Sequence, residues 1–217
     1  MNVWLSAFLI LMVLSNLALL GSSRLGVCIR CVAFQGWLLA FLPFFVHTEG
    51  AVYRLLLIAL GTLVLKGFVF PALLTRSMQE ADVRREVEPF IGYSLSLLFG
   101  LVAWLGCHWI AARFPLPTEP GMVLLLSEAL FTMYAGFFLI VSRKKALTQV
   151  IGYLVLENGI YIIGITLAQN EPLLVEMGIL LDVFAAVFIM GITMFHINRE
   201  FDHIDTDRLS TLKDWDS

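Results

Sequence analysis

Apolar stretches long enough to cross a lipid bilayer occupy most of this chain, and they constrain its fold more than any other feature. A transmembrane α-helix needs about 20 mostly apolar residues. Of the 217 residues 59% are hydrophobic and 14% charged, whereas soluble proteins are about half apolar and a quarter charged. The sequence therefore predicts an all-α integral membrane protein with about seven transmembrane helices, at 3–21, 27–47, 51–75, 90–112, 121–142, 146–168 and 173–197.

Lysines and arginines are concentrated in every second connecting segment. Cytoplasmic loops of membrane proteins carry an excess of these cations. If the N-terminus lies outside, only Arg54 and Arg113 fall on the outer side, and we expect an N-out, C-in orientation. The cations then on the inner side are Arg24, Arg30, Arg76, Arg84, Arg85, Arg143, Lys144, Lys145, Arg199, Arg208 and Lys213.

The spans suggest three regions: four helices in 1–120, three helices in 121–197 and a polar, acid-rich cytoplasmic tail in 198–217. The net charge of -3 gives no indication of nucleic-acid binding. The chain has no phosphate-binding glycine loop and no nucleophile elbow, and the lone Cys28-x-x-Cys31 pair supplies too few ligands for zinc or an iron-sulfur cluster. We therefore expect no catalytic residue, no metal and no cofactor.

Three ionisable residues, Glu157, Asp182 and Lys66, lie near the middle of predicted spans. At 1.5 Å per residue, Glu157 is about 21 Å from Arg143 and about 20 Å from Asn170. A charge at this depth costs at least about 2.5–3.5 kcal/mol, and such residues often belong to ion or proton paths. We predict that these three are proton-relay groups. The alternative is a structural hydrogen bond or ion pair without a transport role.

Glu128 and Glu176 are shallower, about 10 and 6 Å below the outer ends of their helices. They are predicted to be groups where protons enter or leave, or else interfacial groups. For Glu176, just after Pro172, a further alternative is an acid favoured by the dipole at a helix N-terminus.

Supporting groups are predicted along the span 146–168, where polar residues recur every four positions and so share one helix face. Such a face can hold waters or partners for a proton, although a tyrosine in a membrane helix is more often a packed aromatic with a satisfied hydroxyl. The residues are Gln149, Tyr153, Glu157 and Tyr161, with Asn158 beside them. Within other spans, Pro43 and Pro71 each free a backbone carbonyl that another helix or water must satisfy.

Several blocks of the chain resemble the hydrogenase-4 component E family. They are SRKKALTQVIGYLVLENG at 142–159, PLLVEMGILLDVFAAV at 172–187, LSTLKD at 209–214, Phe34-Gln35, and Lys66 with Pro71. This resemblance implies a membrane subunit of an energy-converting hydrogenase or formate hydrogenlyase complex related to respiratory complex I. The last three helices are similar to the K subunit of complex I and to the C subunit of multisubunit cation/proton antiporters.

In the K subunit, mid-membrane glutamates on the second and third helices contribute to a polar axis for protons. The resemblance implies a similar role for Glu157 and Asp182. Two departures qualify the match: Glu157 lies about one turn later relative to Gly152 than in the family pattern, and Asp182 stands in place of a glutamate.

The resulting hypothesis is a subunit, without an active site of its own, of a hydrogenase-like or complex I-like redox complex in a prokaryotic inner membrane. Its buried carboxylates and lysine would contribute to proton or cation translocation coupled to electron transfer. The implied partners are large antiporter-like subunits, a complex I-like anchor subunit and soluble hydrogenase or dehydrogenase iron-sulfur subunits. The alternatives are a subunit of a cation/proton antiporter without a redox partner, and a structural membrane spacer.

Overall fold

The computed structural model describes residues 3–46, 52–80, 89–114, 121–167 and 191. These residues form helices and no strand, which confirms the predicted fold class. The elements are α1 (Val3–Gly21), α2 (Leu25–Val46), α3 (Val52–Val64), the π-helix η1 (Leu65–Val69), α4 (Phe70–Glu80), α5 (Tyr93–Ala111), α6 (Met122–Ser142) and α7 (Ala146–Leu167).

Within the described residues, six helices are long and apolar enough to cross a membrane. The third is continuous from α3 through η1 into α4, and its candidate membrane span is Ala59–Gln79. The predicted span 173–197, with Asp182 and Glu176, falls outside the described residues apart from Gly191, as does the tail 198–217. The six spans therefore agree with the first six of the seven that the sequence predicts.

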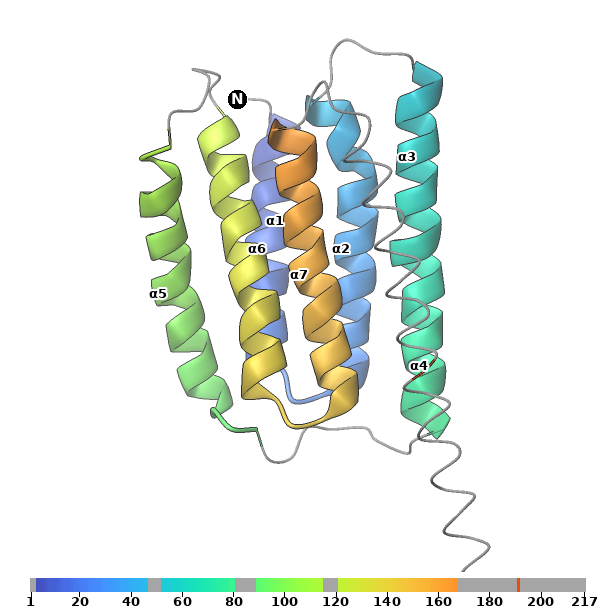
Figure 1. Cartoon of the computed structure of the whole chain (residues 1–217), viewed down its shortest axis with the longest axis vertical. Coiled ribbons are helices and arrows are strands. Elements are labelled where there is room, and N and C mark those ends of the chain that lie inside the picture. The colour runs from blue at the N-terminus through green and yellow to red at the C-terminus, as the bar shows by residue number, and fades with distance from the viewer. Residues whose placement is uncertain (1–2, 47–51, 81–88, 115–120, 168–190, 192–217) are drawn as a thin grey trace, which may run out of the picture.

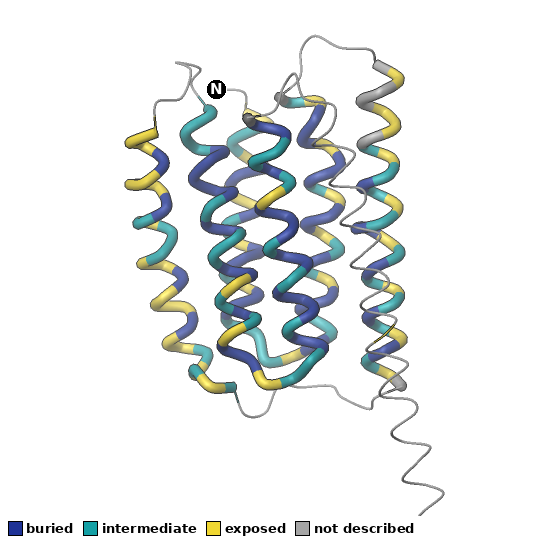
Figure 2. The backbone as a smooth tube through the Cα atoms, in the orientation of Figure 1, coloured by how far each residue is buried: buried dark blue, intermediate teal, exposed yellow. Residues whose placement is uncertain are grey.

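The middle of the bundle consists of α1, α2, α6 and α7, with α5 at one side and α3–η1–α4 at the other (Figure 1). α6 packs against α7, α5 packs against α6 and α1, and α3 and η1 pack against α2. Buried residues gather on the middle helices, whereas the outer faces of α5 and α3 are exposed (Figure 2). The loops 22–24 and 143–145 and the end of α4 lie at the same end of the bundle, which is the predicted cytoplasmic end.

Two apolar clusters fill the bundle, one toward each end. The cluster at the predicted cytoplasmic end includes Leu19, Ile29, Leu139 and Ile151. The opposite cluster includes Phe8, Met12, Leu39, Leu125 and Ile162. Along each of the four middle helices, buried polar residues lie between the two clusters. The bundle therefore holds a polar layer between two apolar layers.

Glycines allow α6 and α7 to approach each other closely. A Cβ atom on Gly152 would lie 2.8 Å from the Gly136 carbonyl oxygen and 2.9 Å from the Ile140 nitrogen. A Cβ on Gly159 would lie 2.7 Å from the Met133 nitrogen. Small residues at such positions are the usual means by which membrane helices pack backbone to backbone. α6 and α7 are therefore in backbone-to-backbone contact at Gly136, Gly152 and Gly159.

The π-helical turn η1 ends two residues before Pro71, which has no N–H to donate to the Gly67 carbonyl four residues earlier. The indole Nε1 of Trp37 on α2 donates to that carbonyl oxygen instead, at 3.4 Å. This confirms the expectation that another helix satisfies the carbonyl freed by Pro71. π-Turns of this kind are frequent at functional sites, and this one carries Lys66.

Candidate functional site

Lys66 and Glu157 form an ion pair in the polar layer. The Lys66 Nζ lies 3.5 Å from the Glu157 Oε1, and each side chain is only 4% exposed. Nζ also donates to the Asn158 Oδ1 at 3.3 Å and lies 5.2 Å from the centre of the Tyr161 ring. The carboxylate, the amide oxygen and the ring face all favour a cation at this position. The two mid-depth residues of opposite sign therefore meet directly.

Three side-chain amides continue the layer from Asn158 across the bundle. The Asn158 Nδ2 donates to the Gln35 Oε1 on α2 at 3.0 Å. The Gln35 Nε2 donates to the Asn16 Oδ1 on α1 at 2.8 Å and to the Ser15 Oγ at 2.9 Å. A buried amide without partners costs several kcal/mol, so these bonds explain how three amides remain inside an apolar bundle.

Glu128 on α6 forms the other end of the layer. The Asn16 Nδ2 donates to the Glu128 Oε1 at 3.1 Å and to the Thr132 Oγ1 at 2.8 Å. The Thr132 hydroxyl donates to the same carboxyl oxygen at 3.2 Å. Glu128 is only 2% exposed within the bundle. It is therefore a buried partner of α1.

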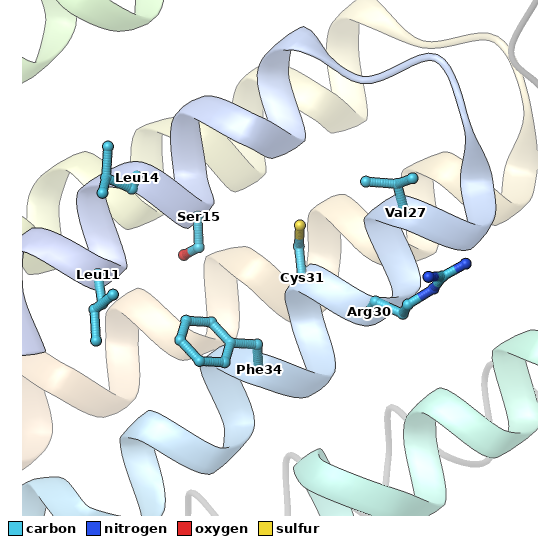
Figure 3. Close-up of a pocket in the computed structure, with 7 residues that line it drawn as sticks. All are labelled: Leu11, Leu14, Ser15, Val27, Arg30, Cys31 and Phe34. Atoms are coloured by element: carbon cyan, nitrogen blue, oxygen red, sulfur yellow. The ribbon is translucent and has the colours of Figure 1, made fainter.

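Two pockets approach this layer from the surface. One, of about 300 Å³, lies between α1, α5 and α6. Its polar lining includes Ser6, His108, Ser127 and Glu128. The other, of about 330 Å³, lies between α1 and α2, where Ser15 faces the gap (Figure 3). Its remaining lining residues are Leu11, Leu14, Val27, Arg30, Cys31 and Phe34.

The polar stripe predicted along α7 divides between two places. Glu157, Asn158 and Tyr161 join the layer, and the Thr62 Oγ1 donates to the Tyr161 hydroxyl at 3.1 Å. Gln149 lies at the predicted cytoplasmic end of the helix, where its Nε2 donates to the Arg143 carbonyl at 3.1 Å. The Tyr153 side chain packs against the apolar cluster at that same end. The spacing of four residues therefore grouped side chains that contact different parts of the bundle.

Asn16, Ser15 and Thr132 belong to the layer but are absent from the sequence predictions, and Gln35 entered them only through the family resemblance. A signal for Asn16 was present: it is an amide inside a predicted span of mostly apolar residues. Because an amide in a membrane helix needs a partner, such a residue indicates a contact between helices. The sequence does not show which helix supplies that partner.

Arg143 follows α6 at the predicted cytoplasmic end, and its side chain is buried there, with 1% exposed. Its guanidinium donates to the Leu20 carbonyl at 2.8 Å, the Ile91 carbonyl at 3.3 Å and the Ser96 Oγ at 3.4 Å. It also lies 4.5 Å from the centre of the Tyr93 ring. Arg143 thus joins the ends of α1 and α6 to the start of α5.

In the described part of the chain, no group of three or more His, Cys, Asp or Glu side chains is arranged to hold a metal ion. Cys28 and Cys31 lie one turn apart on α2, and both thiols are free.

A family model described as NADH-ubiquinone/plastoquinone oxidoreductase chain 4L matches residues 122–214. An uncharacterized protein of Mycobacterium tuberculosis is 31% identical over 206 residues, which cover 94% of this chain and 93% of that protein. Hydrogenase-4 component E of Escherichia coli K12 and of Shigella flexneri are each 28% identical over 163 residues, which cover 75% of this chain and 76% of theirs. No solved structure matches the chain. The chain is thus a multi-pass inner-membrane protein homologous to hydrogenase-4 component E, with a C-terminal region that matches the oxidoreductase chain 4L family.

Proposed function

We propose that this chain is a membrane subunit of a complex I-like, hydrogenase-type redox complex and takes part in proton or cation translocation. The single observation that carries the proposal is the buried Lys66–Glu157 ion pair, which is placed in a polar layer between two apolar clusters. Ionisable groups at this depth are expensive and generally functional. The family relationship supports the same assignment.

The ion pair supplies groups that can exchange a proton at low dielectric. When Glu157 takes up a proton, Lys66 loses its ionic partner, so the net charge of the pair changes. Glu128 borders a pocket and is proposed as a group where protons enter or leave.

Two further groups are proposed on the predicted seventh span. Asp182 is proposed as another relay group, and Glu176 as a second outer group. Tyr161 and Asn158 support the ion pair directly, and Tyr153 and Gln149 remain proposed supporting groups on α7.

The proposed partners perform the electron transfer that drives this movement. The Escherichia coli and Shigella relatives are named as components of a hydrogenase. We infer an assembly with large antiporter-like subunits, a complex I-like anchor subunit and soluble iron-sulfur subunits of the hydrogenase or dehydrogenase type. In such an assembly the chain is not catalytic by itself.

The test compares Glu157→Gln and Lys66→Met with the unchanged protein in native membranes. Purification of the tagged chain with mass spectrometry shows whether the complex assembles, and a pH-sensitive dye in inverted vesicles measures proton uptake driven by the complex's redox substrate. We expect assembly to persist and proton uptake per electron to be lost. Thr166→Val is the control, because its buried hydroxyl donates within its own helix, to the Ile162 carbonyl at 2.7 Å.

Each other outcome has a defined meaning. Full proton uptake in Glu157→Gln contradicts a relay role for this residue. Loss of the assembled complex in both variants supports the structural spacer, and copurification of antiporter subunits alone supports an antiporter without a redox partner.

A further inference from the structure

The hydrogen bonds between Lys66 and Glu128 all point in one direction. Lys66 donates to Asn158, Asn158 donates to Gln35, Gln35 donates to Asn16, and Asn16 donates to Glu128. Each amide accepts a bond from the side of Lys66 and donates one toward Glu128. We call Asn158, Gln35 and Asn16 the amide chain.

The chemistry of Lys66 dictates this direction. An ammonium group has three donors and no acceptor, so Asn158 must present its amide oxygen to it. The amide nitrogen of Asn158 then faces Gln35, which must present an oxygen in turn, and the same reasoning applies at Asn16. The chain consequently ends with an N–H group facing Glu128. Thr132 follows the same order, because it accepts from Asn16 and donates to Glu128.

We propose that the amide chain consists of positioning residues that couple the charge of Lys66 to the charge of Glu128 across the bundle. The coupling has a definite sign: a charged Lys66 turns the N–H groups toward Glu128 and thereby stabilises its carboxylate form. A protonated Glu128 that donated to Asn16 would favour the opposite direction, which would turn the Asn158 amide N–H toward the Lys66 ammonium. This inference rests on the proposed function to the extent that both groups change charge during turnover.

The amide chain transmits orientation and not a proton. Primary amides are not acids or bases near neutral pH, so the proton at one end stays there while the bond directions change together. The N-terminal helices thus have a specific part in the layer: α1 and α2 supply two of the three amides that join Glu128 on α6 to the ion pair.

Other titratable groups also act on the two ends. Glu157 and Tyr161 on α7 face Lys66. On α5, His108 lines the same pocket as Glu128, and the Cys107 thiol interacts electrostatically with that carboxyl group. A test must therefore change the amide chain while these groups stay in place.

The test uses the full chain in membranes and measures the reaction of Glu128 with dicyclohexylcarbodiimide over a series of pH values. A protonated carboxyl group adds across a C=N bond of this apolar reagent and rearranges to a stable N-acylurea, which peptide mass spectrometry locates. The pocket of about 300 Å³ beside Glu128 gives the reagent access. The quantity compared is the pH at which labelling of Glu128 is half-maximal.

Lys66→Met is made alone and together with Gln35→Met, which keeps the length of the side chain but removes both hydrogen-bonding groups. We expect Lys66→Met alone to raise the pH of half-maximal Glu128 labelling, so that half-maximal labelling occurs at a severalfold lower proton concentration. In the presence of Gln35→Met, the same substitution should have little effect on this pH. Ser15→Ala is the matched control, because it removes the other acceptor of Gln35 but leaves the amide chain intact, so the effect of Lys66→Met should persist. If Gln35→Met fails to fold, Asn158→Leu interrupts the same chain.

An equal effect of Lys66→Met with and without Gln35→Met would overturn the proposal, because the coupling would then act through space. The absence of any effect in the otherwise unchanged protein, or of any Glu128 labelling, would also overturn it. These labelling results are distinct from failure of the proposed function. Normal proton uptake in Glu157→Gln would reject the relay, but charge coupling between Lys66 and Glu128 could still be measured.

Discussion

Two buried cations, Lys66 in the polar layer and Arg143 at the predicted cytoplasmic end, are held in different ways. Carbonyl groups, a hydroxyl and an aromatic ring surround the Arg143 guanidinium. A carboxylate and an amide oxygen hold the Lys66 ammonium, with a tyrosine ring beside it. None of these Arg143 partners carries a carboxyl group, whereas Glu157 does.

This difference separates a structural cation from a candidate functional one. Arginine remains protonated in proteins, so Arg143 joins three helix ends permanently. Lysine shifts its protonation readily when its surroundings change, and its carboxylate partner can do the same. Burial of a charge is thus not enough to indicate function, because the chemistry of its partners decides.

The largest expected effect comes from breaking the ion pair. Lys66→Glu places two carboxylates together and should lower the free energy of unfolding by about 3–5 kcal/mol, since an uncompensated buried charge remains. The combination with Glu157→Lys should recover most of that loss. Thermal unfolding in detergent measures both variants. A double variant no more stable than Lys66→Glu would show that the pair is not a direct contact.

Arg143→Met should cost about 3 kcal/mol of stability, because hydrogen bonds from a charged group to carbonyls are lost. Proton uptake per assembled complex should be unchanged, unlike in Lys66→Met. Lys144→Met is the control: its ammonium lies 5.2 Å from the centre of the Phe90 ring on the exposed side of the loop, and its loss should cost much less. Reduced proton uptake at normal assembly in Arg143→Met would remove the distinction between the two cations.

Gly36→Ala tests how closely α2 must approach the π-turn that carries Lys66. A Cβ on Gly36 would lie 2.6 Å from the Lys66 backbone carbon, and backbone cannot give way easily, so a cost of about 1–3 kcal/mol is expected. Gly26 on the same helix has nothing within 4 Å of its Cβ position. Gly26→Ala should therefore be neutral or stabilising by about 0.5–1 kcal/mol. Equal unfolding temperatures for the two variants would contradict the close approach.

Thr132→Val should have the smallest effect, about 1 kcal/mol, because it removes one hydrogen-bond donor to Glu128 and one acceptor for Asn16. Thr166→Val removes a buried hydroxyl of the same kind outside the layer. If the amide chain contributes as proposed, only Thr132→Val should also change the pH of half-maximal Glu128 labelling. An equal change in Thr166→Val would point to a general packing effect.

Much of the fold could be predicted because the bilayer imposes simple requirements on length and polarity. Apolar stretches of about 20 residues located the first six helices, and the cations grouped at alternate loops matched one end of the bundle. The depth of Lys66 and Glu157 followed from the rise per residue, and the need of Pro71 for a substitute donor followed from its missing N–H. The family resemblance likewise depended on sequence alone.

The contacts between helices were decided only by the tertiary structure. Depth does not determine which side of a helix faces which neighbour, so the sequence could not show that Lys66 pairs with Glu157, that Glu128 meets Asn16, or that Gln149 binds the Arg143 carbonyl. Periodicity describes one helix at a time, whereas the polar layer joins residues from α1, α2, η1, α6 and α7. Helix rotation and packing bring these residues together, because the buried amides and the ion pair need partners that their own helices do not supply.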